Sequence, residues 1–222
     1  MSARSQSGLI ETMAGGTATF GGTTHDVGTP FIMATANPQE SEGTFIPSEA
    51  FLDRFTFQVR GENFTAEDYA NILRITQKFG SIVLEPVCTY QTVCDIRKFF
   101  YETVKIAPNV EDQIGHFLEI VYSPHDHNCL TTLAQEYGDN IILSGVSGLG
   151  AIHLAGAART LAAFRYRNFV ALDDVYKVLL PVLRHRIIFN RAALQSFRSL
   201  WKQRTVLDTA DTIIKQLIKE AW

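Results

Sequence analysis

Residues 30–55 read PFIMATANPQESEGTFIPSEAFLDRF, and this stretch decides the fold class. Residues 30–36 are apolar without alternation, which is typical of a strand buried on both faces of a parallel sheet. Asn37-Pro38 ends the run in a turn, and Pro47-Ser48 opens a short helix that reaches Phe55. The stretch therefore predicts a buried strand followed by a helix, the alternation of an α/β domain.

The residues before this stretch add a helix and a hairpin. Apolar residues at helical spacing predict a helix over 6–13, which stops at Gly15-Gly16. The β-prone runs 17–20 and 23–27 flank Gly21-Gly22, a pair that suits the positive φ of a hairpin turn. One strand, one hairpin and two helices cannot cover both faces of a parallel sheet. We therefore expect the missing strands to have been removed or to come from another chain.

From residue 65 onward the pattern is helical. Thr65 and Asp68 resemble a capping box, and apolar residues follow at helical spacing. We divide the chain into an α/β part over residues 1–62 and an all-α domain over residues 63–222. Within the latter, further helices are predicted over 90–104, 110–121, 150–167, 172–188 and 205–220.

Composition excludes several classes of protein. The 222 residues are 46% hydrophobic and carry 20 basic against 23 acidic groups, which is typical of a folded globular chain rather than a disordered one. Three cysteines in a chain of this size do not form a disulfide scaffold. No apolar run reaches the roughly 18–20 residues of a membrane span, and the N-terminus lacks a signal-peptide pattern. We expect a soluble, cytoplasmic protein.

The charge is unevenly distributed. Residues 159–222 carry a formal charge of +7, whereas residues 1–158 carry −10. A basic C-terminal part could contact nucleic acid, a nucleotide or an acidic neighbour, or its arginines could lie on a solvated helical face.

Motifs for autonomous nucleotide hydrolysis are absent from the sequence. A phosphate-binding loop needs a lysine directly after a glycine, and none of the seven lysines has one there. The sequence also contains no Asp-Glu dipeptide that could end an apolar strand and hold Mg²⁺. We expect this chain alone to bind no cofactor and to have no ATPase activity.

Three weaker patterns have structural interpretations. His125-Asp-His127 with Cys129 lacks a second cluster to complete tetrahedral zinc coordination, so a polar loop is favoured and no metal is expected. Gly145–Gly150 has Leu149 where a nucleophile elbow requires glycine, and a helix entry is favoured. Arg184-His-Arg186, expected on a helix, could bind an anion or form a solvated or interdomain basic patch.

The motifs taken together resemble the MoxR family of AAA+ ATPases, in collinear order over roughly residues 5–190. The helix over 6–13 and the hairpin are similar to the helix and pre-sensor hairpin of that family. The further matching segments are 30–38, Glu42-Gly43-Thr44, 49–55, Gly145-Val-Ser147, Ala157-Ala158-Arg159, Asp173-Asp174-Val175 and 181–188.

The resemblance implies a fold and two site residues. The chain would comprise an α/β fragment of a P-loop NTPase (AAA+) core, followed by an all-α lid domain. Asn37 matches the sensor-1 asparagine, which orients the attacking water near the γ-phosphate. Arg54 matches the arginine finger, which reaches the nucleotide site of a neighbouring subunit and neutralises charge on the transferred phosphoryl group. The structural alternative is an Asn-Pro turn and a helix-end ion pair of Arg54, for example with Asp53.

Two departures from the family limit what the resemblance implies. The phosphate-binding loop and the acidic Mg²⁺ strand of the family lie upstream of the matched part, so the chain resembles its second half. Leu149 stands where the lid usually has the sensor-2 arginine. Arg159 cannot replace it, since ten helical residues displace it by about 15 Å.

Two functions follow as hypotheses. In the first, the chain is part of a MoxR-type ATPase whose intact form uses ATP and Mg²⁺, assembles as a homo-oligomeric ring and remodels or matures a client protein. In the second, it is a non-catalytic interaction protein, either a degenerate relative that donates Arg54 to a partner or, less favoured, a basic helical module that binds nucleic acid. If the chain is a truncated domain, the edge along residues 30–36 is expected to promote association of the isolated chain.

Overall fold

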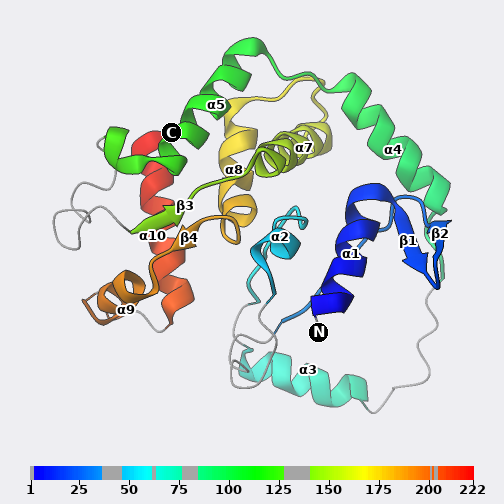
Figure 1. The fold of residues 1–222 in the computed structure, drawn as a ribbon, viewed down its shortest axis with the longest axis horizontal. Helices are drawn as coiled ribbons and strands as arrows, with labels where there is room; N and C mark the ends of the chain where they lie inside the picture. The colour runs from blue at the N-terminus through cyan, green and yellow to red at the C-terminus, as the bar shows by residue number, and fades with distance from the viewer. Residues whose placement is uncertain are drawn as a thin grey trace.

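The computed structural model describes residues 3–36, 47–61, 64–76, 85–127, 141–200, 202 and 205–222. The chain forms an arch (Figure 1), with an N-terminal lobe, residues 3–36, at one end. The other end is a helical lobe, residues 104–127 and 141–222, and α4 runs between the two. The elements are α1 (Ala3–Gly15), β1 (Thr17–Phe20), β2 (Thr23–Asp26), α2 (Glu49–Leu52), α3 (Ala66–Thr76), α4 (Tyr90–Thr103), α5 (Pro108–Tyr122), η1 (Pro124–His127), β3 (Ile142–Ser144), α7 (Gly148–Phe164), α8 (Leu172–Leu183), β4 (Ile188–Phe189), α9 (Arg191–Leu200) and α10 (Val206–Ala221).

The N-terminal lobe contains the predicted helix and hairpin. β1 and β2 pair antiparallel, with Phe20 opposite Thr23, and Gly21 and Gly22 have φ of 58° and 81°. The hairpin prediction is therefore confirmed. Left-handed angles strain a residue that has a side chain, which explains why both turn positions are glycine.

The predicted strand over residues 30–36 is wrong for this structure. These residues have no strand assignment, and Phe31 and Met33 are 87% and 77% exposed. A strand exists only through hydrogen bonds to a neighbouring strand, and this segment is in none of the strand pairs of the described residues. Asn37 and Glu42-Gly43-Thr44 lie outside the described residues.

The helical lobe has a continuous apolar core. α7 and α8 pack along their lengths, since Ala157 and Ala158 on α7 let the two backbones approach closely. Leu154, Leu183 and Ile213 are fully buried at the centre of this lobe. A fold with an α/β fragment followed by a helical domain is therefore confirmed, and the helical lobe is its compact part.

Two boundaries in the helical lobe differ from the prediction. α8 ends at Leu183 rather than at residue 188, because Arg186 donates to the carbonyl of Val182 and closes the last turn. Arg184-His-Arg186 therefore lies in the turn after α8, and β4 follows it to pair with β3. α9 was not predicted, although Asn190 accepts from its first amides in the manner of an N-cap.

α4 links the lobes by side-chain contacts at both ends. The Tyr90 hydroxyl exchanges hydrogen bonds with the backbone of Thr29 near the hairpin, at 2.9 and 3.1 Å. At the other end, Phe100 packs edge-on against Phe164 of α7. In the part of the chain that is described, no helix is long and apolar enough to cross a membrane.

Candidate functional site

Arg54 lies in the turn after α2. The Ser48 side chain accepts from the amide of Phe51 and begins this short helix, which positions the turn. Arg54 is half-buried, and its guanidinium makes no ion pair or hydrogen bond within the described part of the chain. The helix-end ion pair with Asp53 is therefore not formed.

Asp53 instead pairs with the helical lobe. Its Oδ1 lies 2.9 Å from Nε of Arg186, and its Oδ2 accepts from the Ser147 hydroxyl at 2.7 Å. The Ser147 Oγ also accepts from the amide of Gly150 as the N-cap of α7. The helix entry predicted at residues 145–150 is confirmed, and the same serine connects it to the turn that carries Arg54.

Arg186 reaches this turn through a gap beside α7. A Cβ on Gly150 would lie 2.8 Å from Cδ and 3.0 Å from Nε of Arg186, so a side chain there would displace the arginine. The neighbouring Leu149, at the expected sensor-2 position, is half-buried in the first turn of α7. An apolar side chain there cannot contact a phosphate.

A cavity of about 190 Å³ lies at the junction of α2, α7 and the turn after α8. Both partners of the Asp53–Arg186 pair line it, and Glu49 adds a second carboxylate. The remaining lining residues are Ala50, Ser144, Gly145, Ser147, His185 and Ile188.

Two histidines at this junction are held neutral. Burial and, to a lesser degree, the charge of the adjacent Arg186 lower the pKa of His185 to about 4. Burial also lowers the pKa of His153, with a smaller contribution from Arg186 and Arg54. The His153 Nδ1 lies 2.8 Å from the Thr56 hydroxyl, and His185 Nε2 lies 2.8 Å from the Phe55 carbonyl. Both imidazoles therefore contact the segment that follows Arg54.

The sequence pointed to Arg54, but it did not predict which residues surround its turn. The structure places Asp53, Ser147, His153 and His185 there. The Asp53–Arg186 contact spans 133 positions, so no local spacing could indicate it. The available signal was Arg184-His-Arg186, for which an interdomain basic patch was one of the interpretations proposed. The contacts of Arg186 with Asp53 and Phe55 agree with that interpretation.

Several arginines of the basic C-terminal part are engaged internally. Arg165 and Arg167 pair with the fully buried Asp174, and Arg184 pairs with Asp211. These ion pairs reduce the charge available to nucleic acid, which weakens the alternative of a basic binding module.

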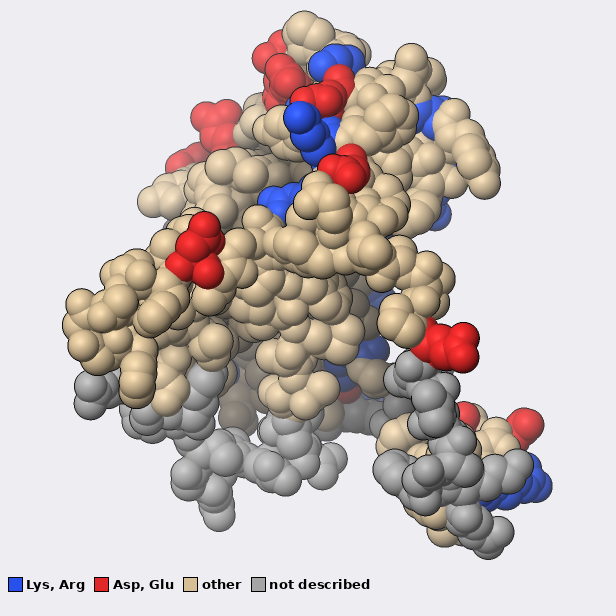
Figure 2. Space-filling model, turned by 90° about the vertical axis from the view of Figure 1, so that its right-hand side faces the viewer, with Lys and Arg blue, Asp and Glu red and all other residues tan. Residues whose placement is uncertain are grey.

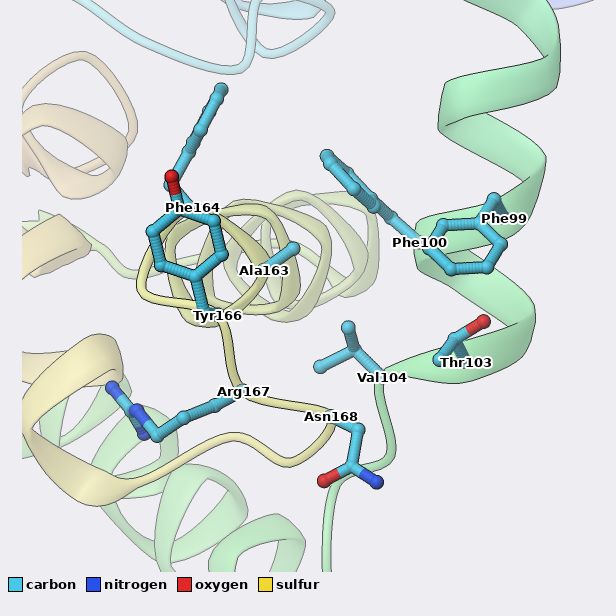
Figure 3. Close-up of a pocket in the computed structure, with 9 residues that line it drawn as sticks. All are labelled: Phe99, Phe100, Thr103, Val104, Ala163, Phe164, Tyr166, Arg167 and Asn168. Carbon is cyan, nitrogen blue, oxygen red and sulfur yellow. The ribbon is translucent and has the colours of Figure 1, made fainter.

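A second, apolar groove of about 480 Å³ lies between the C-terminal ends of α4 and α7 (Figure 3). Phe99 and Phe100 form one wall and Phe164 and Tyr166 the other, with Ala163 between them. It is lined mainly by aromatic side chains. The cation among its lining residues, Arg167, pairs with Asp174, so it offers little free charge to a phosphate.

The described residues contain no group of three His, Cys, Asp or Glu side chains that could hold a metal. Cys129 of the considered zinc pattern lies outside them.

Comparisons with known proteins match both ends of the chain. Residues 1–57 match the ATPase family associated with various cellular activities (AAA), and residues 139–214 match the AAA lid domain. A crystal structure of a candidate ATPase from Cytophaga hutchinsonii aligns with a TM-score of 0.75 at 27% identity, over 97% of this chain and 62% of that one.

Two curated relatives are similar in sequence. The uncharacterized protein YeaC of Bacillus subtilis is 30% identical over 194 residues, which cover 86% of this chain and 56% of YeaC. Chaperone MoxR1 of Mycobacterium tuberculosis is 28% identical over 202 residues, covering 86% of this chain and 49% of MoxR1. The chain thus spans about half the length of the curated relatives that it matches.

Proposed function

Since this chain belongs to the MoxR-like AAA+ ATPases, we propose that Arg54 acts as an arginine finger, completing a nucleotide site whose phosphate-binding residues lie on a neighbouring subunit. The assembly would be a ring that uses ATP and Mg²⁺, and its hydrolysis cycle would drive chaperone-like remodelling of a client protein. The helical lobe would serve as the lid of the subunit.

The observation that carries this proposal concerns the hydrogen bonds and ion pairs of the Arg54 guanidinium. It has no internal partner among the described residues, whereas the carboxylate beside it is held by Arg186 and Ser147. An arginine left unpaired on a fixed turn is available to an anion from outside the chain. In such a site it would stabilise the charge that develops as the γ-phosphoryl group is transferred to water, an effect worth roughly 10³–10⁵ in rate.

Asn37 would act with Arg54 in this proposal. An amide at the end of the apolar run could accept a hydrogen bond from the attacking water and hold it in line with the γ-phosphate. The Mg²⁺ and the phosphates that Arg54 approaches would be bound by the neighbouring subunit.

The test is ATP hydrolysis in a mixed assembly. Full-length MoxR1, carrying alanine at the residue aligned with Arg54, would be titrated with this chain in the presence of ATP and Mg²⁺. We expect this chain to stimulate hydrolysis, and the Arg54→Ala variant to lose that stimulation by about 10³-fold or more. Arg191→Ala, which removes the same charge from the exposed face of α9, is the matched control and should behave as the unmodified chain.

Two results would contradict the proposal. One is hydrolysis that this chain does not change at saturating concentration, and the other is equal stimulation by the Arg54→Ala variant. Calorimetry with ATP and Mg²⁺ on this chain alone separates the sites: binding in the micromolar range would place phosphate-binding residues on this chain itself.

A further inference from the structure

The guanidinium of Arg186 is almost fully buried, with 1% of its side chain exposed, and every polar contact it makes on the α2 side involves the residues around Arg54. Its Nη2 donates to the carbonyl oxygens of Asp53 at 2.9 Å and Phe55 at 2.7 Å. Its Nη1 donates to Thr56 O at 3.3 Å and to Val182 O, at the end of α8, at 2.6 Å. With the ion pair to Asp53, one side chain of the helical lobe fixes the backbone on both sides of Arg54.

The downstream residues are attached to the same lobe. We call residues 53–58 the arginine loop. The Gln58 amide donates to the Pro181 carbonyl of α8 at 2.9 Å, and Arg184 donates to the Gln58 carbonyl at 2.9 Å. The Thr56 hydroxyl contacts His153 on α7. Both ends of the arginine loop are therefore bound to α7, α8 and the turn after α8.

Among the described residues, the hydrogen bond that joins this region to the N-terminal lobe lies before the arginine loop. The Ser48 amide donates to the Gln6 side chain of α1 at 3.0 Å, on the other side of α2. Arg54 thus lies on the side of α2 that is attached to the helical lobe.

We propose that Arg186 is the positioning residue of Arg54, through which the helical lobe sets the location of the finger. This inference rests on the proposed function of Arg54 as an arginine finger. A movement of the helical lobe would carry the arginine loop with it, and would insert Arg54 into the neighbouring nucleotide site or withdraw it.

The chemistry of the contact requires arginine. The planar fork of the guanidinium donates in several fixed directions at once, which three backbone carbonyls of the arginine loop and one carboxylate require. A lysine keeps the charge and can pair with Asp53, but its three donors on one nitrogen cannot span carbonyls on opposite sides of the fork. Arg186→Lys therefore loosens the loop without leaving Asp53 unpaired.

The experiment repeats the mixed-assembly assay with Arg186→Lys, and with Arg165→Lys as the matched control. Arg165 follows α7 in the same lobe, but its guanidinium contacts Asp173 and Asp174 rather than residues of the arginine loop. We expect Arg186→Lys to lower the stimulated kcat by about 10- to 100-fold, since a displacement of about 1 Å can cost that much. The KM for ATP and the concentration of chain that gives half-maximal stimulation should stay within about twofold.

A double-mutant cycle separates positioning from general destabilisation. If Arg186 acts through Arg54, Arg186→Lys has no further effect in a chain that already carries Arg54→Ala. Amide hydrogen exchange should also accelerate over residues 53–58 in Arg186→Lys, by about tenfold or more, while α5 and α10 keep their protection.

The outcomes are distinct. If Arg54→Ala retains full stimulation, the proposed function fails and this inference fails with it. If Arg54→Ala abolishes stimulation while Arg186→Lys leaves kcat unchanged, the inference alone is overturned. It is also overturned if Arg186→Lys lowers hydrolysis equally with and without Arg54, or if exchange over residues 53–58 does not change.

Discussion

The helical lobe and the N-terminal lobe bury their apolar side chains to very different degrees. In the helical lobe, Phe117 and Phe197 are at most 1% exposed within a core shared by several helices. In the N-terminal lobe, Phe20 and Phe31 are 84% and 87% exposed, and Gln6 is the one buried side chain among those described there. Figure 2 views the side on which the hairpin and α4 lie in Figure 1: charged side chains gather at its top, whereas the middle of this face carries few of them.

The difference shows which part is energetically self-sufficient. Burial of apolar area is the main favourable contribution to folding, and the helical lobe obtains it from its own helices. The N-terminal lobe leaves large apolar side chains in water, which is typical of a surface that another protein segment covers. The two lobes should therefore respond differently to substitution.

The largest effect on stability is expected when a substitution leaves a cavity in the core of the helical lobe. The ring of Phe117 packs edge-on against Trp222 at 5.5 Å, joining α5 to the C-terminus. Phe117→Ala should lower the free energy of unfolding by about 3–5 kcal/mol. Phe31→Ala, the same change on an exposed ring, should alter it by less than ~0.5 kcal/mol. Urea denaturation followed by circular dichroism measures both, and equal losses would mean that the lobes do not differ as described.

The next effect is acid sensitivity at the junction with the arginine loop. His185 has a pKa of about 4 in the folded chain, against about 6.5 when unfolded, so the unfolded chain binds more protons between these values. The free energy of unfolding should therefore fall as the pH drops from about 6.5 towards 4, and His153, whose pKa is also lowered, should add to the loss.

The matched variants for this prediction are His185→Gln and His25→Gln, the latter on the exposed hairpin strand β2. Urea denaturation at several pH values should give a flatter dependence for His185→Gln and an unchanged one for His25→Gln. A dependence that His185→Gln leaves as steep as before would show that another group is responsible.

A smaller effect is expected at a helix cap. The Thr205 hydroxyl accepts from the Asp208 amide at 3.1 Å, and the Asp208 carboxylate accepts from the Thr205 amide in return. Thr205→Ala should destabilise the chain by about 1 kcal/mol. Thr24→Ala in the exposed hairpin should change stability by less than ~0.5 kcal/mol, and thermal unfolding would rank the two. A larger loss from Thr24 would contradict the contrast between the lobes.

The smallest effect on stability is expected from substituting exposed apolar residues of the N-terminal lobe, a change that should clearly reduce self-association of the chain. A combined Phe31→Ser and Met33→Ser variant should unfold within ~0.5 kcal/mol of the original chain, since both side chains are exposed. It should also associate less, because residues 30–36 offer unpaired backbone and apolar side chains to other chains. Light scattering across a concentration series measures this. Unchanged association would exclude this segment as the contact.

The elements with strong local signals were predictable. The Gly21-Gly22 hairpin and the helices that match α4, α5, α7 and α10 lie within a few residues of their expected bounds. α9 was missed, although Asn190 with Leu194 and Phe197 provides a cap and an apolar stripe. The end of α8 could not be read locally, because a hydrogen bond from the Arg186 side chain closes it.

The candidate site divides in the same way. The sequence by itself determined the position of Arg54 after a short capped helix and the family to which the chain belongs, because spacing and residue type carry both. Only the tertiary structure decided that Asp53 pairs with Arg186 rather than with Arg54, and that residues 53–58 are attached to the helical lobe. Those contacts join residues more than a hundred positions apart, so they exist only once the helices have packed and brought the charges together.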